Sequence, residues 1–267
     1  MKKTLLFVTL ALATLGAKAQ SNTEDEGVVI NGVKWATRNV DAPGTFATTP
    51  DSPGMFYQWD RNVGWSVTNP LINSNGSTIW NSSSSISNSW EKANDPCPTG
   101  WRVPTEAELS SLFDDTGMVL RLWGTSGNGI AGKVFTTAFF EPIDYLTNAI
   151  FLPAAGNRNG GNGEIEKVNI QGSYWSSTKS DLDDTFLAAR YMAFDAVQSE
   201  AMCNGFRSFA KSIRCVAVST SNLPEDITAE KTATAFYNTM GIKLNKAPES
   251  GVYIVVYDNG SVEKKVK

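Results

Sequence analysis

The chain has 267 residues, of which 19% are charged and 10% aromatic, with a formal net charge of −4 and no histidine. This length suits one domain of about 200 residues plus a small appendage. The acidic balance disfavours nucleic acids and anionic lipid surfaces as partners, because neither is attracted to a negative protein that lacks a clustered basic face. Without histidine, a histidine-based hydrolytic triad is excluded and a zinc site is disfavoured.

Residues 1–19 have the features of an export signal. Lys2 and Lys3 precede an apolar run over 5–15, and residues 17–19 (Ala-Lys-Ala) supply the small residues that a signal peptidase needs. The alternative is a membrane anchor, but the run is too short to cross about 30 Å of hydrocarbon. We therefore predict a secreted or cell-surface protein with no membrane span after cleavage.

Residues 20–27 are short, polar and acidic, and we expect them to form a flexible leader. Residues 28–35 predict a β-hairpin, because Asn31-Gly32 tolerates the positive φ angles of a two-residue turn. Residues 66–89 are rich in Ser and Asn and predict a surface loop.

One helix is indicated after Pro104. Thr105 and Glu108 have the spacing of a capping box, and Leu109, Leu112 and Phe113 follow at helical spacing. We expect the apolar face of this helix to pack on a sheet.

Strands and loops are predicted for the rest of the chain. Residues 172–178 and 212–218 are typical of short buried strands. Residues 219–230 predict a polar linker, and residues 231–267 a small β module in which 251–257 is the clearest strand.

Three ordered motifs in the central region resemble those of one family. They occupy residues 95–109 (Asp-Pro-Cys-Pro-Thr-Gly-Trp-Arg-Val-Pro-Thr-Glu-Ala-Glu-Leu), 172–178 and 212–216, with residues 33–40 matching the usual first strand. Together they resemble the Fibrobacter succinogenes major paralogous domain family. The resemblance covers residues 28–218 and implies an α+β, C-type-lectin-like domain with long loops, followed here by the small C-terminal β module.

The chain has three cysteines, and their spacing alone allows three pairings in an oxidising compartment. The looped architecture that the resemblance implies favours a bridge between Cys97 and Cys215, which leaves Cys203 free or buried. Closing a loop of about 100 residues contributes about 4–5 kcal/mol in the chain-entropy treatment.

The C-terminal module carries a second resemblance. Residues 237–245, 251–255 and 264–267 are similar to the C-terminal sorting modules of Bacteroidetes surface proteins, which address proteins to type IX secretion. This copy is shorter than most, so the alternative is a β module without sorting activity.

Several motifs suggest ligands but lack an essential part. Residues 127–133 fit most of a phosphate-loop pattern, but Val134 stands where a hydroxyl residue should hold magnesium, so a glycine-rich turn is favoured. Glu141-Pro142 lacks the asparagine or aspartate of a calcium-dependent lectin loop. The aspartates at 181, 183 and 184 are close enough to share a cation, but a solvated acidic loop is favoured. We predict no metal and no cofactor.

Two groups of residues are candidates for ligand binding. In C-type-lectin-like proteins the stretch before the final strand commonly faces the ligand, which points to Arg190, Tyr191, Asn204 and Arg207. Among the tryptophans, we expect Trp35, Trp101 and Trp175 to be buried, and Trp65, Trp80 and Trp123, in or beside polar or glycine-rich stretches, to be exposed and able to stack on sugars.

The family analogy predicts an exported, non-catalytic surface binding or adhesion protein, in a fimbrial or glycan-contacting assembly, with a protein or glycan ligand outside the cell. No catalytic residue is assigned. The alternative is a secreted carbohydrate-active or protein-modifying enzyme on the same fold.

Overall fold

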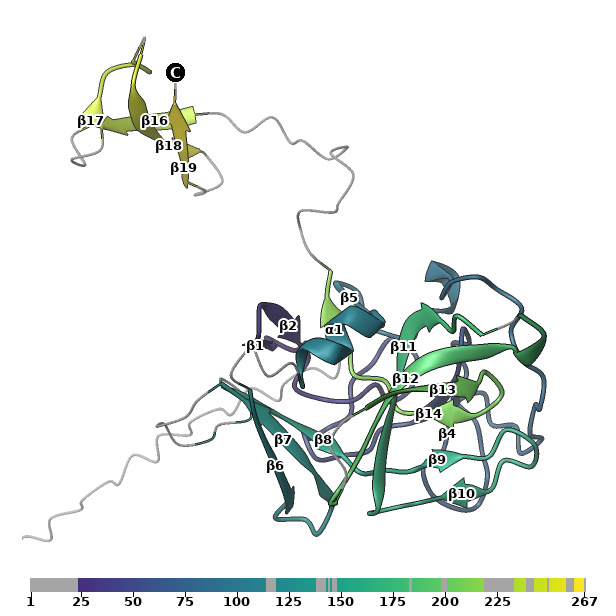
Figure 1. The fold of residues 1–267 in the computed structure, drawn as a ribbon. Coiled ribbons are helices and arrows are strands. Elements are labelled where there is room, and N and C mark those ends of the chain that lie inside the picture. The colour runs from purple at the N-terminus through teal and green to yellow at the C-terminus, as the bar shows by residue number, and fades with distance from the viewer. Residues whose placement is uncertain are drawn as a thin grey trace, which may run out of the picture. The chain divides into compact units, whose positions relative to one another are not determined.

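The structure is a computed structural model, and it describes residues 24–113, 119–137, 143, 145, 148–182, 184–197, 201–218, 233–238, 243–248, 250–257 and 262–266. The chain divides into two compact units, residues 1–218 and 219–267 (Figure 1). The predicted export signal over 1–19 and the predicted linker over 219–230 lie outside the described residues.

The first unit is built almost entirely from antiparallel sheets, so the predicted α+β class is wrong. Its described residues contain a single α-helix, α1 (Glu106–Ser111). The helical spacing lasts only from Leu109 to Leu112, both fully buried. A strong start signal therefore produces fewer than two turns, and the surrounding chain, in short runs between turns, pairs as strands.

Four sheets make up the first unit, with strands given in spatial order. The first contains β1 (Val28–Ile30), β2 (Val33–Trp35), β15 (Val216–Ala217) and β5 (Trp101–Arg102). The second contains β10 (Ile165–Glu166), β9 (Asn157–Arg158), β14 (Ala210–Lys211), β3 (Phe56–Gln58) and β4 (Gly64–Trp65). The third contains β11 (Gln171–Lys179), β12 (Ala188–Asp195) and β13 (Ala201–Phe206), and the fourth β6 (Leu120–Thr125), β7 (Ala131–Thr136) and β8 (Ala149–Pro153). The described residues also include the 3₁₀ turns η1 (Lys92–Asn94) and η3 (Asp184–Phe186).

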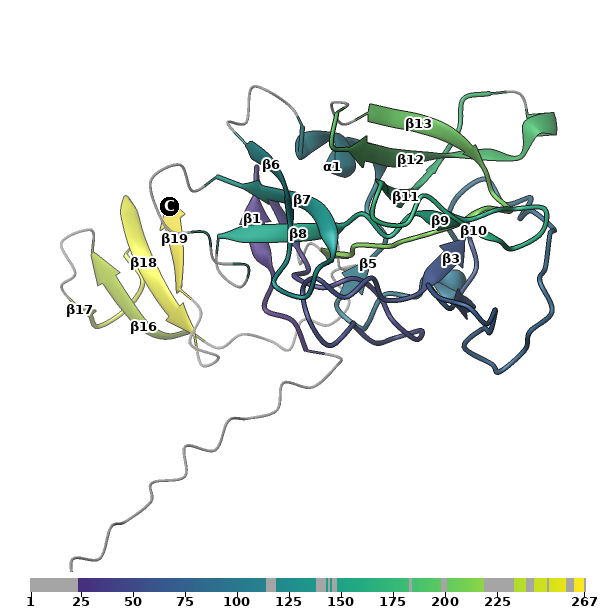
Figure 2. The same ribbon diagram turned by 90° about the horizontal axis from the view of Figure 1, so that it is seen from below.

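The predicted cap of the helix is confirmed. The Thr105 hydroxyl accepts a hydrogen bond from the Glu108 amide, and the Glu108 carboxylate accepts one from the Thr105 amide. Helix α1 packs on the β11–β12–β13 sheet, as expected from its apolar face (Figures 1 and 2). The helix thus packs on the same sheet whose strands β12 and β13 contribute to the candidate site.

Local turn signals are also confirmed. β1 and β2 form the predicted hairpin, and its turn residues Asn31 and Gly32 have φ angles of 48° and 78°. The glycine-rich motif over 127–133 is a turn between the antiparallel strands β6 and β7, followed by the start of β7. It therefore lacks the strand–loop–helix context of a phosphate loop.

Of the two strands predicted near the end of the first unit, one is confirmed in full and the other only in part. The strand predicted over 172–178 lies within β11. Of residues 212–218, only Val216 and Ala217 form a strand, while Ser212 makes an isolated bridge to Tyr174. Arg214 interrupts the run because its fully buried guanidinium donates to Asn39, Ala36 and Phe151.

The disulfide between Cys97 and Cys215 is confirmed, with a Cα–Cα distance of 6.1 Å across 118 residues of chain. It fixes the segment before β5 to the segment before β15, which are neighbouring strands in the first sheet. Cys203 is free and half-buried on β13.

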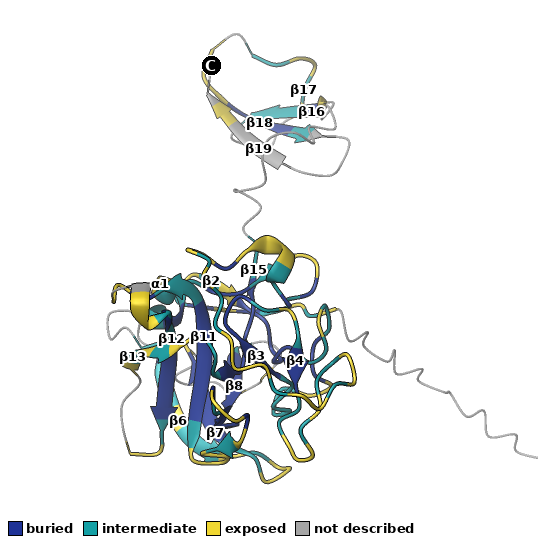
Figure 3. Cartoon of the chain, turned by 90° about the vertical axis from the view of Figure 1, so that its right-hand side faces the viewer, coloured by how far each residue is buried: buried dark blue, intermediate teal, exposed yellow. Residues whose placement is uncertain are grey.

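The hydrophobic core runs through the centre of the first unit, where β11, β12 and β8 are mostly buried (Figure 3). Trp35, Trp59 and Trp175 are among its fully buried side chains. The indole nitrogens of Trp59 and Trp175 donate to the carbonyls of Ser176 and Tyr57, respectively. These bonds satisfy polar atoms that would otherwise be costly to bury.

Asp25 anchors the described part of the predicted leader to the body of the unit. Its enclosed carboxylate accepts from the amide and hydroxyl of Thr37 and lies 3.3 Å from Nε of Arg38. A further bond joins it to the Gly27 amide. Residues 24–27 are therefore anchored by hydrogen bonds, while residues 20–23 of the predicted leader lie outside the described residues.

The second unit contains one antiparallel sheet among its described residues. In spatial order it comprises β17 (Lys243–Leu244), β16 (Ala233–Asn238), β18 (Val252–Tyr257) and β19 (Val262–Val266). The strand predicted over 251–257 corresponds to β18. The sorting role of the whole C-terminal module stays a prediction. No helix in the described part of the chain is long and apolar enough to cross a bilayer.

Candidate binding pocket at the β12–β13 hairpin

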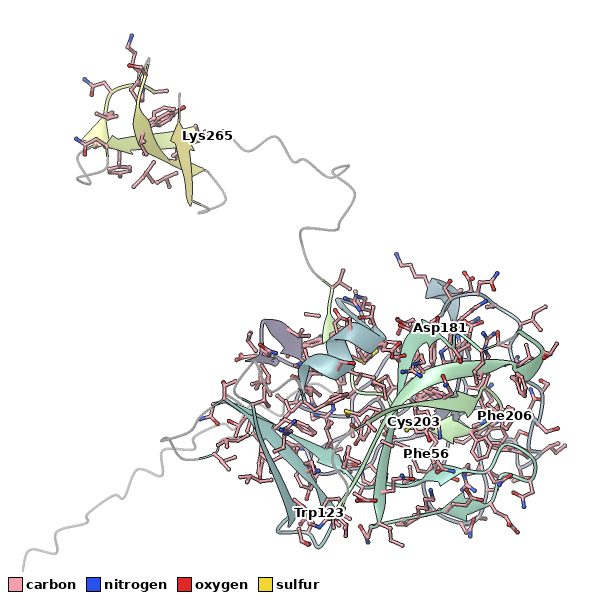
Figure 4. All side chains as sticks on the ribbon, in the orientation of Figure 1. Phe56, Trp123, Asp181, Cys203, Phe206 and Lys265 are labelled. Atoms are coloured by element: carbon pink, nitrogen blue, oxygen red, sulfur yellow. A yellow bond between two sulfur atoms is a disulfide. The ribbon has the colours of Figure 1, made fainter. Side chains whose placement is uncertain are left out.

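An apolar pocket of about 230 Å³ lies beside the β12–β13 hairpin. Its rim is formed by Leu182, Phe186 and Phe206, whose side chains are 46%, 53% and 53% exposed. Phe206 is the last residue of β13, with the free Cys203 further back on the same strand (Figure 4). Large apolar side chains left in contact with water around a concavity are typical of a binding site.

The interior of the pocket is lined by residues from β12, β13 and β14. Ala188 and Lys211 are 7% and 4% exposed and form the buried part of the lining. Tyr191 and Phe209 add aromatic walls, and Gly205 is also part of the lining. A Cβ atom on Gly205 would lie 3.0 Å from the Tyr191 ring, so the glycine leaves room for that ring.

The ammonium group of Lys211 is surrounded by aromatic rings. Its Nζ lies 3.9 Å from the ring centroid of Tyr191, 5.1 Å from that of Trp175 and 5.2 Å from that of Phe209. Tyr191 and Trp175 also contact each other edge to face, with centroids 5.6 Å apart. The faces of such rings attract a cation, which partly replaces the water that Lys211 has lost.

Burial lowers the pKa of Lys211 from 10.5 to about 7. The positive charge of Lys167 lowers it in the same direction, whereas Cys203 and Glu166 act against the shift. Burial likewise raises the pKa of Tyr191 to about 12, with a contribution from Cys203. Near neutral pH, Lys211 therefore exists as both amine and ammonium, and Tyr191 is a neutral phenol.

Secondary structure explains how Lys211 comes to be buried. Lys211 pairs with Tyr57 of β3, which places β14 inside the second sheet. The carbonyl of the same Tyr57 accepts the indole hydrogen bond of Trp175, which fixes that ring beside the lysine. The lysine position is thus set by main-chain pairing, independently of its charge.

Two of the predicted binding residues, Tyr191 and Asn204, line this pocket. Arg190 is drawn away from it: its guanidinium lies 2.6 Å from Glu106 of α1, and a second nitrogen donates to Asn204 at 3.0 Å. These three predicted residues are therefore neighbours, but Arg190 is engaged in holding α1 against β12.

Arg207 was predicted to bind ligand, but the structure buries it. It is 3% exposed, donates hydrogen bonds to the carbonyls of Ala188, Ser85 and Ser87, and lies over the Trp59 ring at 4.3 Å. Its donors fasten the serine-rich loop to the body of the unit, so a ligand has no access to them.

The three tryptophans predicted to be exposed lie outside the pocket. Trp65 is 2% exposed, so that expectation is wrong for it. Trp80 is half-buried, with its ring centroid 4.8 Å from that of Trp65 and its indole nitrogen donating to Gly160. Trp123 is half-buried against Phe194, with centroids 6.5 Å apart. Trp65 instead packs with Phe56, Ala155 and Ala210, and the ring of Trp80 lies against it.

Among the tryptophans expected to be buried, Trp35 and Trp175 are confirmed, both fully enclosed. Trp101 is only half-buried.

Lys211 and the aromatic rim were not among the residues predicted from the sequence. A usable signal was present, because alternation places Phe209, Lys211 and Ile213 on the same side of an extended chain. A lysine between two apolar residues of one face is an inward-pointing charge, which is expensive unless it is paired or functional. The rings that surround it come from distant segments and leave no local pattern.

No metal centre is found in the described part of the chain, where no group of three or more Cys, Asp or Glu side chains converges. Of the predicted acidic loop, residue 183 lies outside the described residues. Among the described residues lining the pocket, Lys211 carries the only formal charge. The site is therefore suited to bind through apolar contact and one cationic group.

Comparisons of this chain with protein-family models, curated proteins and solved structures found no match.

Proposed function

We propose that this chain is an exported, non-catalytic surface binding or adhesion protein, and that the pocket at the β12–β13 hairpin holds part of its ligand. The observation that carries the proposal is the open apolar concavity with exposed Phe186 and Phe206 at its rim. Isolated exposed apolar residues are ordinary, but several around one cavity are typical of recognition sites.

The size of the pocket limits what it can hold. A cavity of about 150 Å³ accepts a benzene ring, so about 230 Å³ accepts one ring or short alkyl chain with a small substituent. A glycan or protein ligand would insert a single group here and make its other contacts on the surrounding surface. The motif order over 95–109, 172–178 and 212–216 supports a binding role through the family that it resembles.

The proposal is tested by screening the purified chain on glycan and cell-surface protein arrays, with matched variants. Phe206→Ser removes an apolar side chain at the rim, and Ala188→Leu fills the interior. Ile86→Ser is the control, because Ile86 is 83% exposed and does not line the pocket.

We expect Phe206→Ser and Ala188→Leu to lose array binding at least tenfold while Ile86→Ser retains it. If all three variants retain array binding, the pocket is not the ligand-binding site. Release of a product from a bound glycan would instead support the secreted-enzyme alternative.

A further inference from the structure

Lys211 differs from the buried arginines of the same unit. Arg158, Arg207 and Arg214 each donate several hydrogen bonds to carbonyl oxygens. Among the described residues, the Lys211 ammonium has neither a hydrogen-bond acceptor nor a carboxylate within an ion-pair distance. The ammonium reaches the open pocket, so its acceptors must come from water there or from a ligand.

The missing acceptor fits into the pocket itself, because Lys211 is part of its lining. We propose that the pocket takes a small carboxylic acid with an apolar body, whose carboxylate pairs with the ammonium of Lys211. This inference rests on the proposed function, since it names the ligand class of the same site.

The walls select the apolar body of the ligand. Phe186, Phe206 and Phe209 offer ring surfaces around the cavity, and Ala188 leaves space next to Lys211. The volume of about 230 Å³ matches a phenyl group with a short acid chain or a short alkyl acid.

The charge selects the headgroup. One ammonium balances one negative charge, which favours a carboxylate over a phosphate dianion, and a cationic ligand would be repelled. A charge-assisted hydrogen bond in an apolar site is roughly twice as strong as a neutral one. The ring contacts of Tyr191 and Trp175 orient the ammonium without using its three hydrogen-bond donors.

The proposed pairing makes binding depend on pH. The charged or titratable groups that shift the pKa of Lys211 are Lys167, Cys203 on β13 and Glu166 on β10, and the titratable Tyr191 on β12 contacts it through its ring. Without ligand the pKa of Lys211 is about 7, and a bound carboxylate raises it. Affinity should therefore be full below pH 7 and fall about tenfold per pH unit above it, until the pKa of the complex is reached.

Two matched probes isolate the charge: 3-phenylpropanoate and 3-phenyl-1-propanol share one body and differ in the headgroup. Binding to the full chain is followed by calorimetry and by tryptophan fluorescence, since Trp175 contacts Lys211. Lys211→Met removes the ammonium at similar length, and Lys34→Met removes an exposed lysine as the control.

We expect the acid to bind at least tenfold more tightly than the alcohol at pH 6.5, and at least tenfold more weakly at pH 8.5 than at pH 6.5. Lys211→Met should abolish the preference for the acid and keep the alcohol's affinity, while Lys34→Met changes neither. Thermal unfolding of both variants confirms that they are folded.

Equal binding of acid and alcohol, or a preference that survives in Lys211→Met, overturns the carboxylate assignment and leaves the binding pocket standing. If neither probe binds the wild-type chain, the ligand class is wrong, and the array result with Phe206→Ser decides the proposed function separately.

Such a carboxylate has two sources, a free acid or the C-terminal residue of a peptide. N-acetylphenylalanine and its amide repeat the comparison for the second source. Tighter binding of N-acetylphenylalanine than of 3-phenylpropanoate assigns the site to peptide C-termini, and the reverse order assigns it to free acids; both orders support the carboxylate.

Discussion

Replacing Lys211 by methionine should stabilise the protein, because it removes a desolvated charge from the interior. The pKa of Lys211 falls from 10.5 to about 7 on folding, which at about 1.36 kcal/mol per pKa unit amounts to about 5 kcal/mol against the charged form. The three rings already offset part of this cost, by about 0.5–2 kcal/mol for a desolvated cation. We therefore expect Lys211→Met to raise the free energy of unfolding by about 3–4 kcal/mol at pH 7.

The pH dependence gives this prediction its sign. Between pH 7 and 10.5 the unfolded chain binds a proton at Lys211 that the folded chain has released, so wild-type stability rises with pH over this window. The penalty is complete below pH 7 and absent above 10.5. The advantage of Lys211→Met should accordingly shrink by about 2 kcal/mol between pH 7 and pH 9.

Urea denaturation followed by tryptophan fluorescence reports the unfolding of the first unit, because all eight tryptophans lie within residues 1–218. It therefore measures the stability difference between Lys211→Met and wild type. Lys34→Met, on an exposed strand position, should stay within about 0.5 kcal/mol of wild type at both pH values. A Lys211→Met variant less stable than wild type, or a difference that does not change between pH 7 and pH 9, would refute the burial argument.

Three further predictions concern the framework of the first unit. Cys215→Ser should lower the free energy of unfolding by about 3–5 kcal/mol through loss of its disulfide, and a wild-type urea midpoint unaffected by reductant would contradict this. Thr105→Ala should cost about 1 kcal/mol through loss of the helix cap, whereas Ser110→Ala inside the same helix stays within about 0.5 kcal/mol; equal effects would argue against the cap. Asp25→Ala should cost about 3 kcal/mol because it leaves Arg38 buried without its carboxylate, and limited proteolysis should then cut the segment around residue 27; unchanged resistance would show that this anchor is dispensable.

The features predicted well from sequence are those in which a few neighbouring residues hold all the information. The turn at Asn31-Gly32 follows from backbone sterics, and the cap at Thr105 from a hydrogen bond to a residue three positions later. The bridge between Cys97 and Cys215 was reached through a family resemblance, since spacing alone left three pairings open.

The fold class could not be derived from the same local signals. The cap at Thr105 fixes where the helix begins but not where it ends. The helix length depends on which later residues pair as strands instead. Similarly, Trp65 lies beside polar residues that suggest exposure, but it packs against Ala155 and Ala210 from distant segments. Composition near a side chain is a weak guide to burial when the covering segments are far away in sequence.

The candidate site shows most clearly which features depend on the sequence alone and which depend on the tertiary structure. By itself the sequence determined that a charged residue, Lys211, lies in alternation with apolar ones, and that Tyr191 and Asn204 belong to the stretch before the last strand. Only the tertiary structure decided that Arg207 is enclosed and that the rings of Trp175, Tyr191 and Phe209 surround the lysine. The physical reason is that desolvation and ring contacts are properties of segments brought together by folding, which the order of residues along one strand does not contain.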